Sequence, residues 1–349
     1  MKNRFFMRLS GLVFSLLLVA ALTLVSCGPD APDVSSSSDG TSSSDITLLP
    51  TPADNYKPHI AVLNGTTGFG IAPLYQSFTE GKADYIDSID FYADPALISP
   101  QFIQGSIDIA AVPTNLASVL FNKTGGNVKV IAVNTLGVLY ILENGNTVSS
   151  LSSLEGKTVC VPGQGSNPEY VLRAILKLSG LEDKVTIDYT YTNPDELTTA
   201  VASGKASIAL LPEPKVSAAL SKNAGLRVAL DISAEWKNVT GADLIQGCLI
   251  AGEKFCEEHP SVLGRFLTDY SSSVNLLNAD PANAADIIVN VAKLAPSTSL
   301  VESALPRCNI VCQTGAEIAA PLNNYWKALF DIIPSSVGGA LPTDGIFLK

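Results

Sequence analysis

Histidine is nearly absent from this 349-residue chain, which contains only His59 and His259. Two isolated imidazoles leave little room for a histidine-based metal centre or a Ser-His-Asp triad, and no metal-ligand spacing or phosphate-binding loop occurs. Basic residues are also scarce, because 22 Lys and Arg stand against 33 Asp and Glu and the formal net charge is −11. Phosphate contacts need clustered Lys and Arg, so nucleic acid is not expected as a partner. We expect no metal and no cofactor.

Apolar residues, by contrast, are abundant. The chain is 46% hydrophobic and 16% charged, which is too apolar for a disordered protein. Its length is sufficient for two hydrophobic cores.

The N-terminus has the order of a secretory signal peptide: a basic start, an apolar run over residues 11–25 and a small residue before Cys27. The four residues that end at Cys27 resemble the bacterial lipoprotein signal, in which this cysteine begins the mature chain and carries lipid. An uncleaved membrane anchor is the alternative, since the run is close to the ~18-residue lower limit for spanning a bilayer. We predict a signal peptide over 1–26, lipidation at Cys27, and a protein anchored to the extracytoplasmic face of the cell membrane.

Residues 27–56 are rich in Ser, Asp, Pro and Gly and show no apolar period, which predicts a lipidated flexible tether. Five cysteines remain beyond Cys27, and an odd number cannot all pair within one chain. We expect most of them to be small buried thiols.

The remaining sequence contains a repeat. Residues 60–118 align with residues 158–217 at a nearly constant spacing of about 98 residues. Each copy has a short apolar strand, a glycine-containing loop, a helical pattern, a second strand, a proline-initiated helix and an apolar third strand. This alternation predicts an α/β fold with mainly parallel sheets, and two copies predict two lobes.

The order of the elements also predicts how the chain divides between the lobes. The chain crosses to the second lobe near 136–142 and returns within 230–248. Residues 57–137 and 249–349 then form a discontinuous first lobe, and residues 138–248 form the second. The two crossings act as the hinge.

Loops at the carboxyl ends of parallel strands bind the ligands of open α/β sheets, and two facing lobes bring such loops to one cleft. The first loop, Asn64–Gly70, has three glycines that allow close backbone approach, although a tight strand-to-helix turn explains them too. In the second copy, Ser166 and Glu169 are spaced for a helix capping box, which competes with a ligand contact. The candidate ligand-binding residues are Thr66, Thr67, Gly68, Phe69, Thr114, Asn115, Asn134, Gln164, Ser166, Asn167 and Glu213.

Taken in order, these loops resemble the substrate-binding proteins of ABC importers. The motifs are Asn64–Gly70, Ile109–Asn115, Gly163–Tyr170 and Ala209–Pro214, and the likeness covers about residues 57–332. They are most similar to the nitrate, sulfonate and taurine group, which includes binders of thiamine pyrimidine precursors. The resemblance implies a two-lobed type II periplasmic-binding fold, capture of a small solute by hinge closure, and docking on ABC permease subunits. We expect a monomer.

The candidate loops contain one acid, Glu213, and no Arg or Lys. A carboxylate accepts the N–H donors of an amine or aminopyrimidine, although Glu213 could instead complement a helix dipole. Aromatic residues that could form a stacking wall, each of which could also be core, are Phe69, Tyr92, Tyr140, Tyr170 and Trp236. We therefore predict a small polar solute, neutral or weakly cationic and pyrimidine-like. If Arg307 reaches the cleft, an anion such as nitrate or a sulfonate is the alternative.

An enzyme and a surface sensor are the rival classes. A thiamine-pyrimidine synthase is similar at the level of fold, but that group depends on a histidine and on neighbouring cysteines. Here His59 precedes the first strand, His259 lies at a helix start, and the cysteines are scattered. We therefore predict a binding protein rather than an enzyme, with a sensor or adhesin of the same fold as a further alternative.

Overall fold

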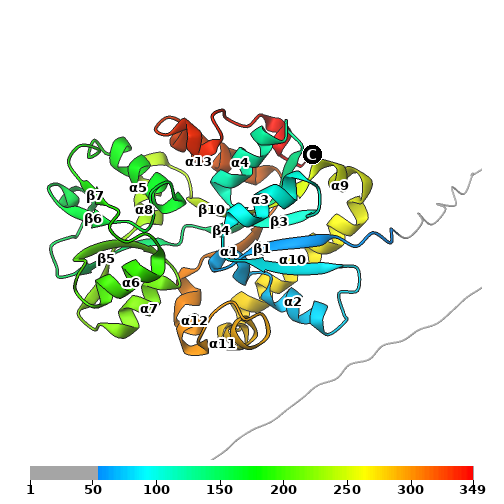
Figure 1. The fold of residues 1–349 in the computed structure, drawn as a ribbon, viewed down its shortest axis with the longest axis horizontal. Helices are drawn as coiled ribbons and strands as arrows, with labels where there is room; N and C mark the ends of the chain where they lie inside the picture. Colours follow the sequence, from blue (N-terminus) through cyan, green and yellow to red (C-terminus); the bar gives the residue numbers. More distant parts are fainter. Residues whose placement is uncertain (1–53, 349) are drawn as a thin grey trace, which may run out of the picture. The chain divides into compact units, whose positions relative to one another are not determined.

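The computed structural model describes residues 54–348. The expected signal peptide, Cys27 and the tether before residue 54 lie outside the described residues. No helix between residues 54 and 348 is long and apolar enough to cross a bilayer. The described part folds into two lobes, the first on the right of Figure 1 and the second on the left.

The first lobe is built on a six-stranded sheet with the order β11-β4-β10-β3-β1-β2. β1 pairs in parallel with β2 and β3, whereas β10 runs antiparallel to β3 and β4, and β11 runs antiparallel to β4. β10 and β11 therefore run against the other strands. The strands are β1 (His59–Leu63), β2 (Ser88–Tyr92), β3 (Ile109–Pro113), β4 (Val128–Leu136), β10 (Ile245–Gly252) and β11 (Ile310–Gln313).

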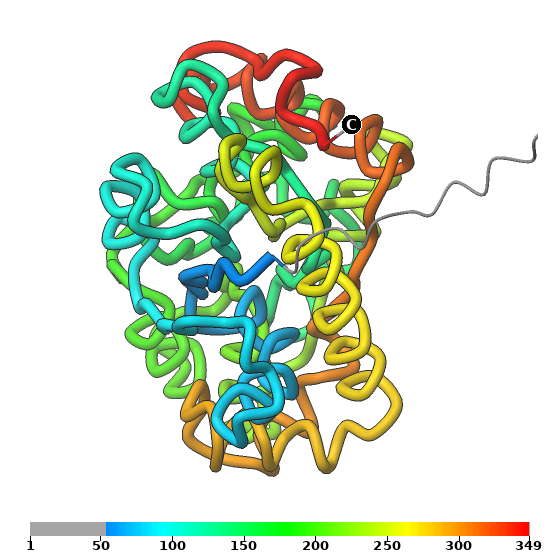
Figure 2. Tube along the Cα trace, turned by 90° about the vertical axis from the view of Figure 1, so that its right-hand side faces the viewer, coloured from blue at the N-terminus to red at the C-terminus, as the bar shows by residue number. Residues whose placement is uncertain are grey.

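The helices of the first lobe come from both ends of the chain. α10 packs against α2, α11 and β11. The segment after α13 returns to α4, where Ser118 and Asn122 donate to the carbonyl of Val337 at 2.8 and 3.0 Å (Figure 2). The helices are α1 (Thr66–Phe69), α2 (Ala72–Thr79), α3 (Pro95–Ile103), α4 (Thr114–Lys123), α9 (Glu253–Glu258), α10 (Pro260–Ala279), α11 (Pro281–Asp286), α12 (Thr298–Ala304) and α13 (Ala319–Phe330).

The second lobe has a five-stranded sheet with the order β7-β6-β8-β5-β9, in which β5 runs antiparallel to β8 and β9. Its strands are β5 (Leu139–Asn144), β6 (Thr158–Cys160), β7 (Thr186–Asp188), β8 (Ile208–Pro212) and β9 (Leu226–Asp231). Its helices are α5 (Asn167–Leu178), α6 (Pro194–Ala202), α7 (Lys215–Lys222) and α8 (Ile232–Thr240).

The two copies of the repeat fold alike. The strands β2-β1-β3 and β7-β6-β8 have the same spatial order, and every pairing within them is parallel. In β3 and β8 the first four residues are buried, as the uniformly apolar sequence of a sheet covered on both faces predicts. The α/β class with mainly parallel strands and two lobes is confirmed.

The two crossings between the lobes are bonded to each other. The chain leaves β4 through Gly137 and Val138 and returns at residues 241–244, between α8 and β10. The side-chain oxygen of Gln246, at the start of β10, accepts the Val138 N–H at 2.5 Å. Because β10 pairs with β3 and β4 along its length, the expected boundary at 248/249 falls inside this strand. Its apolar sequence suits either sheet, so the boundary was not visible from composition.

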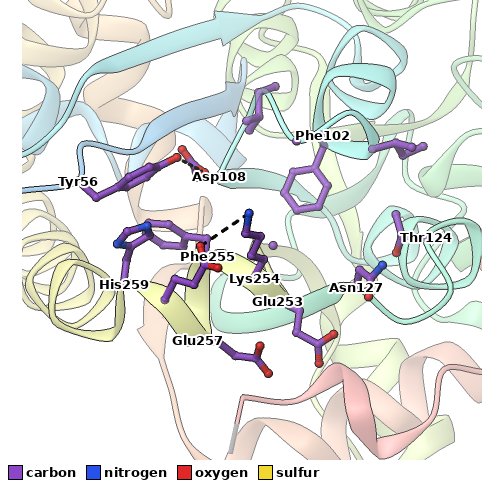
Figure 3. A pocket seen from close by; sticks show the side chains of 15 residues that line it. Tyr56, Phe102, Asp108, Thr124, Asn127, Glu253, Lys254, Phe255, Glu257 and His259 are labelled. Atoms are coloured by element: carbon purple, nitrogen blue, oxygen red, sulfur yellow. Dashed lines mark hydrogen bonds and ion pairs between the residues drawn. The ribbon is translucent and has the colours of Figure 1, made fainter. Parts of the chain in front are cut away.

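The last residues of the expected tether are attached to the first lobe. The Tyr56 ring stacks on His259 with 3.9 Å between centroids, and its hydroxyl donates to Asp108 Oδ1 at 2.9 Å (Figure 3). Asp54 contacts His259 Nδ1 at 3.0 Å. Residues 54–56 therefore belong to the folded lobe and not to a free tether.

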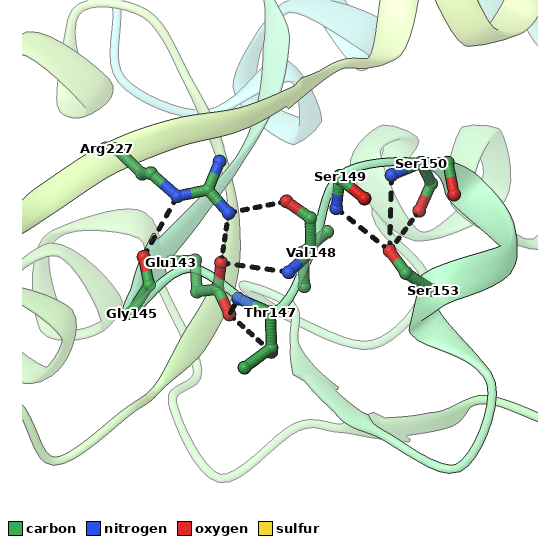
Figure 4. A network of polar contacts seen from close by, with 8 residues as sticks. All are labelled: Glu143, Gly145, Thr147, Val148, Ser149, Ser150, Ser153 and Arg227. Atoms are coloured by element: carbon green, nitrogen blue, oxygen red, sulfur yellow. Dashed lines mark hydrogen bonds and ion pairs between the residues drawn. The ribbon is translucent and has the colours of Figure 1, made fainter.

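A buried carboxylate organises one edge of the second lobe (Figure 4). The side chain of Glu143 is 3% exposed and forms an ion pair with Arg227 at 2.5 Å. Glu143 Oε1 accepts the Thr147 N–H and hydroxyl at 2.8 and 2.6 Å, and Oε2 accepts the Val148 N–H at 3.1 Å. Burial alone would raise the pKa of Glu143, but these hydrogen bonds outweigh it and the pKa lies below its usual value.

Glu143→Gln should lower the free energy of unfolding by about 2 kcal/mol at pH 7, because Arg227 loses its charged partner. A carboxylate whose pKa is lowered by folding contributes stability above its unfolded pKa and loses it as pH falls through the folded pKa. The difference between wild type and variant should therefore shrink in acid, as urea denaturation at pH 7 and at about pH 3 would measure. Glu155→Gln is the matched control, because Glu155 forms an exposed pair with Lys184 at 3.4 Å and its loss should cost under about 0.5 kcal/mol. Equal losses in the two variants would contradict this assignment.

Candidate functional site

A cavity of about 870 Å³ lies between the two lobes. The first lobe contributes residues 64–66 after β1, Ala93 after β2, and α12 with the residues before it. The second lobe contributes the segment Pro212–Pro214 after β8, the first two turns of α6, and one face of α7 along its whole length, Lys215–Lys222. Residues 64–66, Ala93 and Pro212–Pro214 directly follow the carboxyl ends of strands, where α/β proteins bind ligands. The volume suits a small solute.

A second cavity, of about 540 Å³, is lined by first-lobe residues alone (Figure 3). Asp108 in its wall directly precedes β3, and Glu253 directly follows the antiparallel strand β10. This cavity therefore lies at the amino ends of the parallel strands, opposite the interlobe cavity, and it is the weaker candidate.

The charged residues that line the interlobe cavity are mostly paired. Lys215 forms an ion pair with Asp195 inside the second lobe, and Glu213 forms one with Arg307 of the first lobe at 2.5 Å. Lys222 has no ion-pair partner within residues 54–348. The rest of the lining is neutral, with hydroxyl side chains from both lobes and apolar residues such as Leu294 and Leu300.

Glu213 does not offer a free carboxylate, contrary to its expected role as acceptor for a cationic solute. Its side chain is fully buried. Oε1 accepts Arg307 Nε at 2.5 Å and the Ser217 hydroxyl at 3.0 Å, and Oε2 accepts the Ser217 N–H at 3.0 Å. The sequence allows two possible roles for Glu213, and its bonds to Ser217 match the second one, in which the acid complements the first turn of a helix. Arg307 is a further partner, from the other lobe.

Near α13, at the top of Figure 1, polar side chains of the two lobes bond directly to each other. Asn167, the first residue of α5, donates to Asn115 Oδ1 at 3.0 Å and to the Tyr325 hydroxyl at 2.5 Å. Gln246 donates to Asn167 Oδ1 at 3.3 Å and thereby links this contact to the hinge. The structure thus brings the candidate residues Asn115 and Asn167 together across the lobes.

Two buried polar atoms around this contact have no hydrogen-bond partner among the described residues: Thr114 Oγ1 and Trp236 Nε1. Trp236 packs with its ring centroid 5.7 Å from that of Tyr325. Thr114 begins α4, and its carbonyl accepts Trp326 Nε1 at 2.9 Å. Buried donors without a partner cost free energy, but neither atom belongs to the lining of the interlobe cavity.

The first glycine loop forms the short helix α1, and only part of it faces the cavity. Thr66 lines the cavity, whereas the carbonyl of Thr67 accepts Asn134 Nδ2 at 3.0 Å. Phe69 is fully buried in the first-lobe core, so it is not a ligand contact. A Cβ at Gly68 would lie 2.5 Å from the backbone oxygen of Leu63, so this glycine serves close packing on β1.

Asn134 and Gln164 do not reach the cavity either. Asn134 is buried, and its side chain ties β4 to α1 through the Thr67 carbonyl. Gln164 is exposed at the surface of its loop and does not line the interlobe cavity.

Ser166 stabilises its own loop. Its hydroxyl donates to the carbonyls of Pro162 and Gly163 at 2.9 and 2.7 Å, and it makes no capping bond to α5. Glu169 accepts the Gly165 N–H at 2.5 Å. The predicted capping box is therefore wrong, because the Ser166 hydroxyl bonds to carbonyl groups earlier in the loop and not to the N–H groups of α5.

The expected aromatic wall is not part of the interlobe cavity, since none of its five candidates lines it. Tyr140 is buried, which raises the pKa of its hydroxyl, and it donates to the Arg307 carbonyl at 3.2 Å. Tyr92 contacts Gln101 Oε1 at 3.3 Å through its hydroxyl.

Sequence reasoning did not place three residues that join the lobes. Gln246 and Tyr325 were not among the candidates, and Arg307 was considered only as a sign of an anionic solute. All three lie outside the two repeat copies, so matching the copies could not place them. Arg307 next to a buried glutamate has no local sequence signal, because 94 residues separate the partners.

The described cysteines are free thiols, and four of the five are buried. Burial raises the pKa of Cys160 to about 11 and that of Cys248 to about 12. These thiols are protonated at neutral pH and are weak nucleophiles.

Comparisons with known proteins agree with this geometry. Residues 128–284 match the family model described as "NMT1/THI5 like". A search of curated proteins finds no match. The expected resemblance to the nitrate and sulfonate group of ABC transporter binding proteins is confirmed by the family-model match together with the fold.

The solved structures similar to this chain include an ABC transporter protein from Parabacteroides distasonis, with 22% identity, TM-score 0.71, and 85% of this chain and 99% of that chain covered. The periplasmic aliphatic sulphonate binding protein SsuA from Escherichia coli has 18% identity and TM-score 0.68, with 84% and 92% covered. The periplasmic nitrate-binding protein NrtA from Synechocystis has 11% identity and TM-score 0.53, with 70% and 68% covered. This likeness shows the two-lobed periplasmic-binding fold.

Gly68→Ala should destabilise the protein by about 2 kcal/mol or more, because its Cβ would press on the Leu63 backbone and would also lie 2.9 Å from Val62 Cγ1. Gly252→Ala is the control, since nothing lies within 4 Å of its Cβ position and its φ of −65° suits alanine. Chemical denaturation of both variants measures the difference. A Gly68→Ala protein with wild-type stability would return Gly68 to the list of possible ligand contacts.

Proposed function

We propose that this protein is the extracytoplasmic solute-binding component of an ABC importer and that it holds its solute in the interlobe cavity. The single observation that carries the proposal is the cavity of about 870 Å³ at the carboxyl ends of strands from both lobes. The fold and the family-model match support the same class.

The proposed mechanism is hinge closure. Within residues 54–348 the chain crosses between the lobes at residues 137–138 and 241–244, so rotation there would open or close the cavity. The bonds from Asn167 to Asn115 and Tyr325 exist only when the lobes meet. A solute shifts the population toward the closed form by binding it better than the open form.

We propose a small polar solute without net charge, and neutral pyrimidines remain the first class to test. The pairing of Glu213 with Arg307 and of Lys215 with Asp195 supports a neutral solute over the cationic one expected from Glu213 alone. An anion is the second candidate, favoured by Lys222, which lines the cavity without an ion-pair partner in the described part of the chain.

We also propose that the protein is a lipoprotein, anchored through Cys27, that works as a monomer and docks on permease subunits. The order of a basic start, an apolar run and a cysteine supports the anchor. Residues 54–56 contact the first lobe, so the chain enters the folded body at that lobe.

A thermal-shift screen of the full chain should find a neutral pyrimidine that raises the melting temperature, with nitrate and propane-1-sulfonate as the anionic arm. Solute at 100 times its Kd stabilises the folded form by about 2.7 kcal/mol. Lys222→Gln should leave binding of a neutral solute within about threefold, whereas an anion should lose about tenfold or more. Lys123→Gln, at an exposed site on α4 outside the cavity, is the charge-matched control. Binding of none of these classes, or turnover of a bound compound, would count against the proposal.

Replacement of the predicted lipidated cysteine, Cys27→Ala, should release the protein from membranes or leave its signal uncut, because no thiol remains to carry lipid. Fractionation and mass spectrometry of the mature chain measure both effects. Cys312→Ala, which changes a partly exposed thiol in the folded body, should stay on the membrane. Unchanged mass and membrane retention in Cys27→Ala would refute lipidation there.

A further inference from the structure

One ion pair connects the two lobes directly. Arg307 ends a short 3-10 helix, Leu305–Arg307, that follows α12 in the first lobe. Glu213 follows β8 in the second lobe. Arg307 Nε donates to Glu213 Oε1 at 2.5 Å, and a terminal guanidinium nitrogen donates to the Ser217 hydroxyl at 2.7 Å.

The carboxylate depends on this partner from the other lobe. Glu213 is fully buried, and its remaining bonds come from the neutral residue Ser217 in α7, the helix that follows it. Hydrogen bonds between two charged groups are roughly twice as strong as neutral ones. Separation of the lobes would remove the guanidinium and require water to take its place. The closed arrangement therefore has a favourable interaction that the open arrangement lacks.

Arg307 is also held in position by its neighbours. Its carbonyl accepts the Tyr140 hydroxyl of β5 at 3.2 Å, a second bond between the lobes, whereas the next contacts fix Arg307 from its own side. Two residues later, Asn309 Nδ2 donates to the carbonyl of the hinge residue Gly137 at 2.5 Å. The chain then enters β11, which pairs with β4 beside the hinge. The guanidinium is thus pre-positioned for Glu213, which lowers the entropy cost of forming the pair.

We propose that Arg307, Glu213 and Ser217 form an interlobe latch that sets the balance between open and closed lobes in the solute-free protein. This proposal rests on the proposed function at one point: it assumes that the lobes close when the protein binds its solute. The latch itself is a property of the empty protein. It differs from the other ion pair at the cavity, Lys215–Asp195, because both members of that pair belong to the second lobe.

The test measures the distance between the lobes without any solute. Spin labels attached through genetically encoded keto amino acids at exposed Gln104, before β3, and exposed Lys205, before β8, lie away from the cavity and leave every native thiol untouched. Pulsed electron-spin distance measurements on the full chain then give the closed and open populations. In Glu213→Gln and in Arg307→Gln, the ratio of closed to open should fall on the order of tenfold.

Three further variants make the result specific. Lys215→Gln removes an ion pair of the same chemistry within one lobe and should leave the distances unchanged. Arg307→Lys, which keeps the charge, should recover part of the closed population. The double variant Glu213→Gln/Arg307→Gln should open no further than either single change, because both remove one interaction.

Distance distributions in Glu213→Gln and Arg307→Gln that overlay the wild type would overturn the latch. An additive effect in the double variant would overturn it too, and so would opening in Lys215→Gln. Circular dichroism melts identify a variant that does not fold, and Arg307→Lys then carries the comparison. Because no solute is present, these outcomes are independent of whether the solute class under Proposed function is correct.

Discussion

Each lobe depends on the strand that the chain inserts immediately after it crosses from the other lobe. β5 follows the first crossing and lies between β8 and β9, and β10 follows the second and lies between β3 and β4. The hinge residues are therefore anchored inside both sheets, and Gln246 joins one crossing to the other through the Val138 N–H. Two short segments join the lobes, and the lobes face each other where the strands end. The interlobe cavity, the ion pair of Arg307 with Glu213 and the contact between Asn115 and Asn167 all lie between those facing sides.

The features that the sequence could predict are local ones. Strands, loops and helices each have a residue pattern that is visible within a short stretch of sequence. The repeat at about 98 residues shows the same succession of patterns twice. The α/β class, the two lobes and the similar order of β2-β1-β3 and β7-β6-β8 follow from those patterns. The placement of Thr66 at the cavity and the meeting of Asn115 with Asn167 follow from the rule that loops gather at the carboxyl ends of strands.

What could not be predicted depends on contacts between distant segments. Phe69 and Asn134 have residue types suited to a ligand site, but the packing of α1 on β1 and β4 turns both inward. The expectation that Glu213 offers a free carboxylate fails for the same reason, since Arg307 lies 94 residues from Glu213 and outside the repeat. A single acid in a list of loops says little about the local field until its partners are known, because an adjacent guanidinium cancels most of its effect on a ligand.

The pairing of the charged side chains around the cavity affects how the cavity could select a solute. With Glu213 engaged by Arg307 and Lys215 by Asp195, long-range attraction contributes little beyond Lys222. Selectivity must then come from hydrogen-bond geometry and shape. Hydrogen-bonding sites discriminate strongly, because an analogue that lacks the matching group leaves buried donors unpaired. The cavity is lined by hydroxyl side chains from both lobes, such as Thr66 and Thr199, and each can donate to or accept from a neutral polar solute. Recognition by neutral donors also leaves the latch intact, so the same ion pair can hold the lobes whichever polar solute lies between them.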